Sequence, residues 1–172
     1  APMSTALEDH GQWTITAPIT HGKAHGWFTA GRRGGMFEGR AIAIQRGGDG
    51  QPGPRTAAFV LGDGVSIGLD AHEGQRLAWA RMGDMDVEMT DLEQRTDSNG
   101  NHILDFRPAA DLVVTLHPTG VGGVIATDDH LYAPERVIAK SMGLTASRSV
   151  IRARAVIEYE GGQQSATGLI LQ

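Results

Sequence analysis

Two rows of charged side chains are the residues with the clearest chemical potential. Asp84, Asp86 and Glu88 alternate along one predicted strand, and Arg152 and Arg154 alternate along another. Alternate residues of a strand point to the same side of its sheet. On an outer face, which we expect, the two rows would be solvated and would contribute little as ion pairs. Inside a barrel, a desolvated carboxylate would have a raised pKa suited to proton transfer, and this is the basis for an enzyme hypothesis.

The remaining polar residues form no recognised catalytic or metal-binding motif. The seven histidines lack the H-E-x-x-H and H-x-H spacings of common metal sites. The segment that starts at Asp97 begins like a calcium loop, but it has His102 in place of the required glycine and Pro108 in place of the bidentate glutamate. There is no G-x-S-x-G motif and no cysteine. We therefore predict no metal and no cofactor, and the catalytic residues of an enzyme stay unassigned.

The elements that position these side chains are predicted to be strands. Residues 150–159 alternate between apolar and polar side chains, and the chain returns after Gly161 and Gly162 as residues 166–171, which predicts a β-hairpin. Short apolar runs and tight turns between residues 57 and 81 predict further hairpins. Residues 82–92 fit both helical and strand spacing, and we predict a strand. A single short helix is predicted at residues 134–142, with Pro134 in its first turn.

This pattern of about ten or eleven short strands predicts an all-β protein, an antiparallel β-barrel with one short helix. The alternative is a two-sheet β-sandwich. Glycines inside predicted strands, at positions 26, 39, 68 and 168, favour a barrel because a curling sheet needs corners. We also predict interruptions of the strands at residues 18–22 and 118–120. The chain of 172 residues is expected to form a single domain over residues 1–172.

A short motif adds a family resemblance to this pattern. Gly11-Gln12-Trp13 opens the first predicted strand and resembles the G-x-W motif of the lipocalins. The resemblance implies a lipocalin-like barrel that is closed around one small apolar ligand. Thr127-Asp128-Asp129 is similar to the later T-D-Y of that family. It departs from the family in having Asp in place of Tyr, and it lies just before the predicted helix.

The predicted architecture leads to two main functional hypotheses. A barrel of this size encloses one small molecule, so we expect a protein that binds a small apolar or amphipathic molecule in its pocket. The alternative is a cofactor-independent isomerase or cyclase that acts on a small hydrophobic metabolite in the same pocket. A third hypothesis is a self-associating structural protein, because edge strands pair readily. The residues expected to line the pocket are Trp13, Trp27, Phe37, Trp79, Met85, Met89 and Tyr159.

Charge and hydropathy restrict the partners. The net charge of −5 and the isoelectric point of about 5.8 argue against a nucleic-acid partner, which requires clustered Lys and Arg. The N-terminal residues have no apolar signal segment, and no stretch approaches the roughly 20 apolar residues of a membrane span. We therefore predict a cytoplasmic protein with no membrane partner, either as a monomer or as a homodimer.

Overall fold

The chain divides into two compact units. The computed structural model describes residues 13–30, 33–48, 55–72, 75–89, 92–107, 110–126, 131–141 and 147–172. Residues 1–48 form one unit, and residues 49–172 form the other. Each unit has its own β-sheet. The expectation of one domain over the whole chain stays a prediction.

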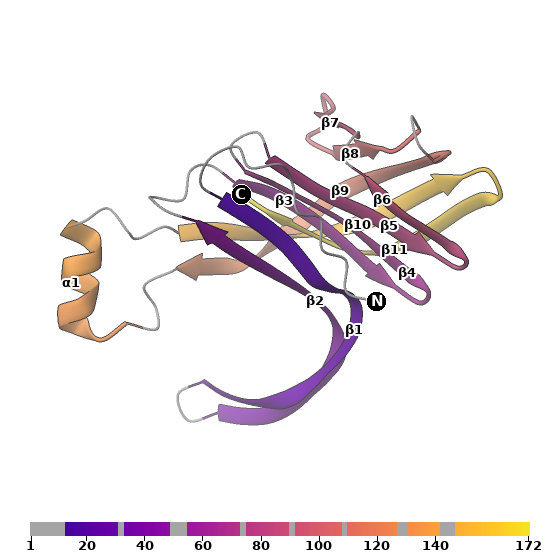
Figure 1. The fold of residues 1–172 in the computed structure, drawn as a ribbon. Coiled ribbons are helices and arrows are strands. Elements are labelled where there is room, and N and C mark those ends of the chain that lie inside the picture. Colours follow the sequence, from indigo (N-terminus) through magenta and orange to yellow (C-terminus); the bar gives the residue numbers. More distant parts are fainter. Residues whose placement is uncertain are drawn as a thin grey trace. The chain divides into compact units, whose positions relative to one another are not determined.

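The first unit is a long antiparallel ribbon of two strands. Strand β1 (Trp13–Ala30) pairs with β2 (Arg33–Gly48), as Figure 1 shows. The predicted interruption at residues 18–22 was wrong, because β1 is a single strand. Its register with β2 shifts between Thr16 and Ile19 and again between Ile19 and Gly22. These irregularities take up the proline and glycine that the sequence analysis interpreted as a loop.

The second unit is an antiparallel sheet of nine strands, in the order β6-β5-β4-β3-β11-β10-β9-β8-β7. The sheet is curled through 231° as a half-barrel, and the structure is 76% strand, which confirms the all-β prediction. In the described part of the chain, β6 and β7 are the two edges of this sheet. The strands are β3 (Arg55–Gly62), β4 (Val65–His72), β5 (Gln75–Met82), β6 (Met85–Met89), β7 (Glu93–Thr96), β8 (His102–Asp105), β9 (Leu112–Ala126), β10 (Ser147–Tyr159) and β11 (Gly162–Leu171).

The predicted hairpins are confirmed, but one predicted break is not. Tyr159 pairs with Gly162 at the turn of the β10–β11 hairpin. The ambiguous segment after Met82 contains strand β6, as predicted. In contrast, the break predicted at residues 118–120 was wrong, because β9 runs through it. The pairing of β9 with β10 skips Thr119 and Gly122, so two β-bulges absorb Pro118 and the neighbouring glycines.

The single helix expected from the sequence is α1 (Ala133–Ser141). Its first turn is closed by the side chain of Glu135, whose Oε2 accepts a hydrogen bond of 2.9 Å from the backbone N–H of Tyr132. This is half of a capping box, in which an acidic side chain satisfies an N–H group that has no partner within the helix.

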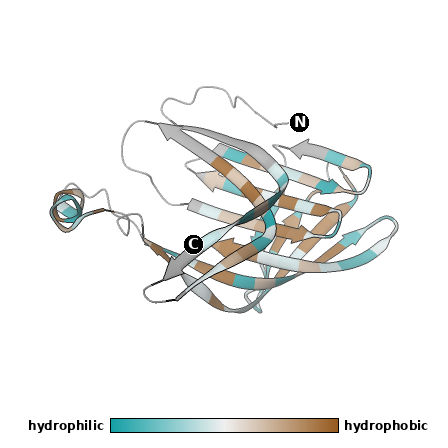
Figure 2. Cartoon of the chain, turned by 90° about the horizontal axis from the view of Figure 1, so that it is seen from below, coloured by the Kyte–Doolittle hydropathy of each residue, from teal (hydrophilic) through white to brown (hydrophobic). Residues whose placement is uncertain are grey.

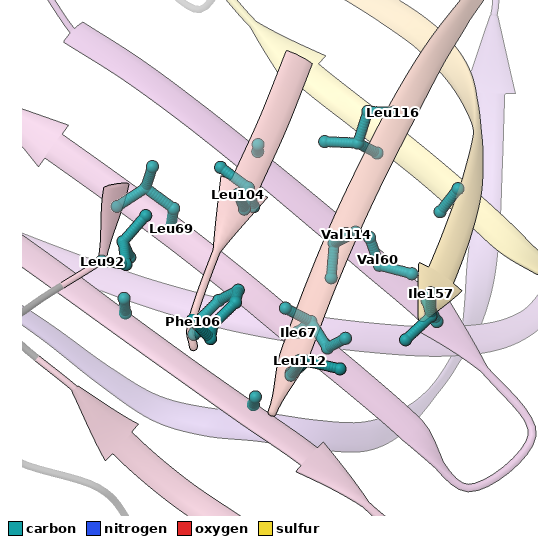
Figure 3. Packing of buried hydrophobic residues seen from close by; sticks show 14 of the residues in the cluster. Val60, Ile67, Leu69, Leu92, Leu104, Phe106, Leu112, Val114, Leu116 and Ile157 are labelled. Carbon is teal, nitrogen blue, oxygen red and sulfur yellow. The ribbon is translucent and has the colours of Figure 1, made fainter. Parts of the chain in front are cut away.

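The core lies on the inner, concave face of the nine-stranded sheet. Ile67 on β4 and Leu104 on β8 belong to one buried cluster although these strands are not neighbours, and only the concave side of a curled sheet brings such side chains together. Figure 2 shows apolar residues recurring along these strands, and Figure 3 shows the packed cluster. Side chains that are 0% exposed include Val60, Ile67, Leu69, Leu104, Phe106, Leu112, Val114, Leu116, Ile157 and Ile170.

Two of the strand glycines make room for large side chains. A Cβ atom added at Gly68 would lie 2.2 Å from Cζ2 of Trp79, and one added at Gly168 would lie 2.3 Å from Cδ2 of Leu116. Both distances are far below a normal contact between carbon atoms. These glycines therefore have a packing role that the sequence analysis, which interpreted them as barrel corners, did not assign.

Candidate functional site

The residues predicted to line one pocket are divided between the two units. Trp13, Trp27 and Phe37 lie in the first unit, and the other four lie in the second. Trp27 is 68% exposed and Phe37 is 47% exposed. The side chains of Trp13 and Met89 lie outside the described part of the structure.

Within the second unit, the predicted pocket residues also lie on different faces. Trp79 is buried on the outer face, where its Nε1–H donates a hydrogen bond of 3.2 Å to Oγ of Ser66. Its ring stacks on Phe59 with a centroid distance of 6.1 Å. Tyr159 instead packs against the cluster of the inner face. Met85 pairs with Met82, which also packs against that cluster. The structure does not bring Trp79 and Tyr159 into one pocket.

The inner face is filled by its own side chains. The largest residues of the cluster, among them Phe106, Leu112 and Ile157, are 0% exposed. A ligand-sized cavity between them would appear as exposed surface on these residues. Barrels with about this number of strands are commonly just wide enough for side chains to fill. The described core therefore leaves no space for a ligand among these residues.

The described members of both charged rows are exposed, as expected for an outer face. Arg152 and Arg154 are exposed on β10, and Asp86 on β6 forms an exposed ion pair with Arg81. The structure describes Asp84 as exposed, whereas the side chain of Glu88 lies outside the described part. The rows belong to strands that are separated by β5, β4, β3 and β11. They therefore do not pair with each other across neighbouring strands within the sheet.

The C-terminal part of β9 is an unusual sheet edge. Strand β8 pairs with β9 only as far as Leu116, so residues 117–126 have no described strand on that side. We call these residues the free edge of β9. The free edge contains no Asp, Glu, Lys or Arg. Its apolar side chains are exposed, Val121 by 75%, Val124 by 62% and Ile125 by 55%.

Sequence reasoning missed this edge because it interpreted Pro118 and Gly120 as the end of a strand. The available signal was the unbroken run of uncharged residues from 117 to 126 in a chain that is 20% charged. Edge strands normally carry charged residues, prolines or bulges that prevent pairing with other chains. On β9, Pro118 and the bulges at Thr119 and Gly122 provide this protection, but residues 123–126 lack it.

A cationic side chain lies across the bulged part of the free edge. A Cβ atom added at Gly122 would lie 3.2 Å from Cγ and 3.6 Å from Nε of Arg152. The side chain of Arg152 therefore runs from β10 over the backbone of β9, toward the free edge. The bulge at Thr119 is fixed to the same residue, because Oγ1 of Thr119 donates a hydrogen bond of 3.1 Å to the carbonyl of Arg152. Arg154 donates a hydrogen bond of 3.3 Å to Oγ of Ser165.

A chain of hydrogen bonds orients His117 at the start of the free edge. The Nδ2 amide of Asn101 donates to Oδ2 of Asp97 over 2.8 Å, and Nδ1 of His117 lies 3.0 Å from Oδ1 of Asn101. Since a carboxylate only accepts, the amide oxygen faces the imidazole, and His117 donates through Nδ1. The side-chain amide of Asn101 is the main cause that lowers the pKa of Asp97. His117 is paired in register with Arg154.

Another histidine, His102, is buried on the inner face. Its Nε2 lies 3.3 Å from Nε2 of Gln172, which donates to it, so the neutral ring carries its proton on Nδ1. Nδ1 has no hydrogen-bond partner in the described part of the structure. Desolvation lowers the pKa of His102 because burial disfavours the charged imidazolium. The ring has a structural role here, since it is enclosed by the core.

Mild acid should destabilise the second unit through His102. Because its pKa is lowered by folding, the unfolded chain binds a proton near the usual histidine pKa of about 6.5 while the folded chain does not. The free energy of unfolding is therefore not reduced by His102 above this pH, and it falls as the pH decreases toward the pKa of His102 in the folded chain. Urea melts at neutral and mildly acidic pH measure the loss. The variant His102→Leu should show a smaller loss, whereas His25→Gln, at an exposed position, should behave like wild type. Equal losses in His102→Leu and wild type would contradict this assignment.

Two kinds of feature are absent from the described residues. The described residues contain no group of three or more His, Asp or Glu side chains placed to hold a metal ion. Among the same residues, no helix has the length and apolar character needed to cross a membrane.

Comparisons with known proteins add no relative to this description. No protein-family model, curated protein or solved structure matches the chain. The residues that carry the lipocalin resemblance, apart from Trp13, lie outside the described part of the structure. The relationship to the lipocalins therefore stays a prediction.

Proposed function

We propose that this protein is a protein-binding module that accepts an extended segment of a partner chain at the free edge of β9. The observation that carries the proposal is an uncharged sheet edge with exposed Val121, Val124 and Ile125. An extended segment that adds to such an edge gains hydrogen bonds from the backbone and specificity from alternate side chains. The unprotected stretch at residues 123–126 is the point at which pairing would start.

The other exposed apolar residues that the structure describes lie on surfaces less suited to strand addition. Tyr132, Val137 and Ile138 are exposed on or beside α1, but the backbone of a helix is hydrogen-bonded within itself. A partner at α1 would therefore contact side chains without forming hydrogen bonds to the backbone of the helix. On the ribbon of the first unit, Trp27 and Met36 are exposed and paired in register. That ribbon also carries exposed charges, such as Lys23, Glu38 and Arg40, which discourage strand addition.

The filled inner face favours a surface function over a pocket function. Binding of a small apolar molecule, the function expected from the sequence, stays a prediction, but the described core offers it no space. The enzyme hypothesis needed charged rows inside the barrel, whereas Arg152, Arg154 and Asp86 are exposed. A binding module requires neither a cavity nor desolvated acids.

Selection of extended peptides tests the proposal. A library of random linear peptides displayed on phage is panned on the full chain, and the selected peptides are measured against variants. We expect Val124→Lys to weaken their binding by about tenfold or more, because a charge on an edge strand opposes pairing. The variant Val137→Lys, at an exposed apolar site on α1, serves as a matched control and should bind like wild type.

Hydrogen exchange locates the peptide on the protein. Bound peptide should slow the exchange of backbone amides within residues 123–126, since a paired edge satisfies them. Protection elsewhere, or equal binding to wild type and to Val124→Lys, would show that the free edge of β9 is not the binding surface.

A further inference from the structure

We infer that the natural occupant of the free edge of β9 is strand β6 of a second copy of this chain, so that copies join head to tail. This inference rests on the proposed function of the β9 edge and names its partner. It follows from the positions of β6 and β9 in the same sheet and from the charged side chains that lie beside each of these edges. Strand β6 is the last strand at one end of the nine-stranded sheet, and in the described part of the chain no further strand pairs with it.

The β9 edge is cationic on its outer face. Arg152 lies across the backbone of Gly122, and the structure describes no acidic side chain that pairs with it. Arg154 follows two residues later on the same face of β10, and its described partner is the hydroxyl of Ser165. The nearest acid on this face of β10 is Glu158, four residues from Arg154. Like charges placed so close together repel each other, and an acidic neighbour would relieve that repulsion.

The β6 edge is acidic on the same outer face. Asp86 is exposed and accepts hydrogen bonds from Nε and Nη2 of Arg81 through Oδ2. A carboxylate has two oxygens and accepts from more than one donor, so Oδ1 can accept from a second guanidinium. The exposed Asp84 lies beside it in the turn before β6. The registers across the sheet place Asp86 and Arg154 in one lateral row, at opposite ends.

Head-to-tail pairing is the arrangement that brings opposite charges together. Pairing of two β9 edges would place the arginines of both copies in one interface, and pairing of two β6 edges would place the acids of both copies in one interface. Like charges across an interface oppose association. In the head-to-tail arrangement, the arginines beside the β9 edge of one copy, Arg152 and Arg154, lie next to the acidic β6 edge of the following copy. The inner faces beside the two edges are both apolar. Val121 at the β9 edge pairs in register with Ile151, and Met85 at the β6 edge pairs with Met82.

Such a contact uses two different surfaces and therefore does not close by a two-fold axis. Heterologous contacts produce rings when the rotation closes and open chains when it does not. The mean mass of the wild-type protein in solution should therefore rise with protein concentration. Because the contact includes exposed charges, the rise should be larger at low ionic strength than at high ionic strength.

Charge reversal in two separate variants provides the decisive experiment. We expect Arg152→Glu alone and Asp86→Lys alone to weaken self-association by about tenfold each, because attraction becomes repulsion. An equal mixture of the two variants should recover association, since each mixed contact again joins opposite charges. Sedimentation velocity of the full chain measures all four samples. The variants Lys23→Glu and Glu160→Lys reverse exposed charges in other elements, β1 and the turn between β10 and β11, and they should associate like wild type.

The possible results separate this inference from the proposed function. Recovery in the mixture, with loss in each single variant, supports head-to-tail pairing. A wild-type protein that stays monomeric, or a mixture that does not recover, overturns it. If peptides still bind at residues 123–126 in that case, the strand-adding function stands and only the second copy is ruled out as its occupant. If the peptides also fail to bind there, both proposals fall.

Discussion

Replacing Ile157 with alanine is expected to lower the free energy of unfolding by about 2–5 kcal/mol. Ile157 lies on the inner face of β10, it is 0% exposed, and it belongs to the packed cluster. Truncation to alanine removes buried apolar surface and leaves a cavity, because a close-packed core relaxes only in part. Urea melts followed by circular dichroism give the difference between variant and wild type.

The arginines of the same strand are the matched control. Arg152→Ala and Arg154→Ala should each change the free energy of unfolding by less than about 1 kcal/mol, the range for exposed charges. Both side chains are exposed, and the described part of the structure gives them no acidic partner. If either arginine variant were as unstable as Ile157→Ala, the assignment of inner and outer faces on β10 would be wrong.

The faces of this strand show what sequence alone can predict. Ala153, Ala155 and Ile157 alternate with charged residues, and the structure buries these three. The period of two in the sequence is the same as the period of the backbone, so a local pattern is enough to assign the face. The hairpin turn at Glu160 and Gly161 is equally local. For the same reason the strand β6 and the helix α1 were predicted correctly.

The errors concern features that depend on distant parts of the chain. Proline and glycine within β1 and β9 are local signals for a break, yet both strands continue. A strand survives such residues when its partner stays in place and a bulge takes up the extra residue. Whether β10 stays paired beyond Pro118 cannot be deduced from the residues around Pro118. The free edge of β9 was missed for this reason.

Two residues of the predicted pocket, Trp79 and Tyr159, show the same dependence on distant parts of the chain. Aromatic residues and methionines were grouped by their chemistry, but the strand register decides the face on which each one lies. Trp79 and Tyr159 are both large and apolar in character, and they lie on opposite faces of one sheet. The degree of curl, which decides whether the interior is filled or hollow, depends on the packing of all nine strands together. Composition contains no information about it.

A methyl group at Gly68 should destabilise the protein by about 1–3 kcal/mol, the usual cost of overpacking. In Gly68→Ala the added Cβ would lie 2.2 Å from Cζ2 of Trp79. The ring cannot move aside easily, because it is buried, hydrogen-bonded to Ser66 and stacked on Phe59. Urea melts measure the loss, and a shift in tryptophan emission would report displacement of the ring.

Gly39→Ala separates this clash from the general effect of removing a glycine. Gly39 also lies within a strand, and a Cβ atom added there would have no other atom within 4 Å. Alanine restricts the unfolded chain more than glycine does, so at an open site it should be neutral or should stabilise by up to about 1 kcal/mol. Gly68→Ala is thus expected to be destabilising, whereas Gly39→Ala is not. A Gly68→Ala variant as stable as Gly39→Ala would mean that the ring of Trp79 does not lie over Gly68, and that the packing assigned to the outer face of β4 and β5 is wrong.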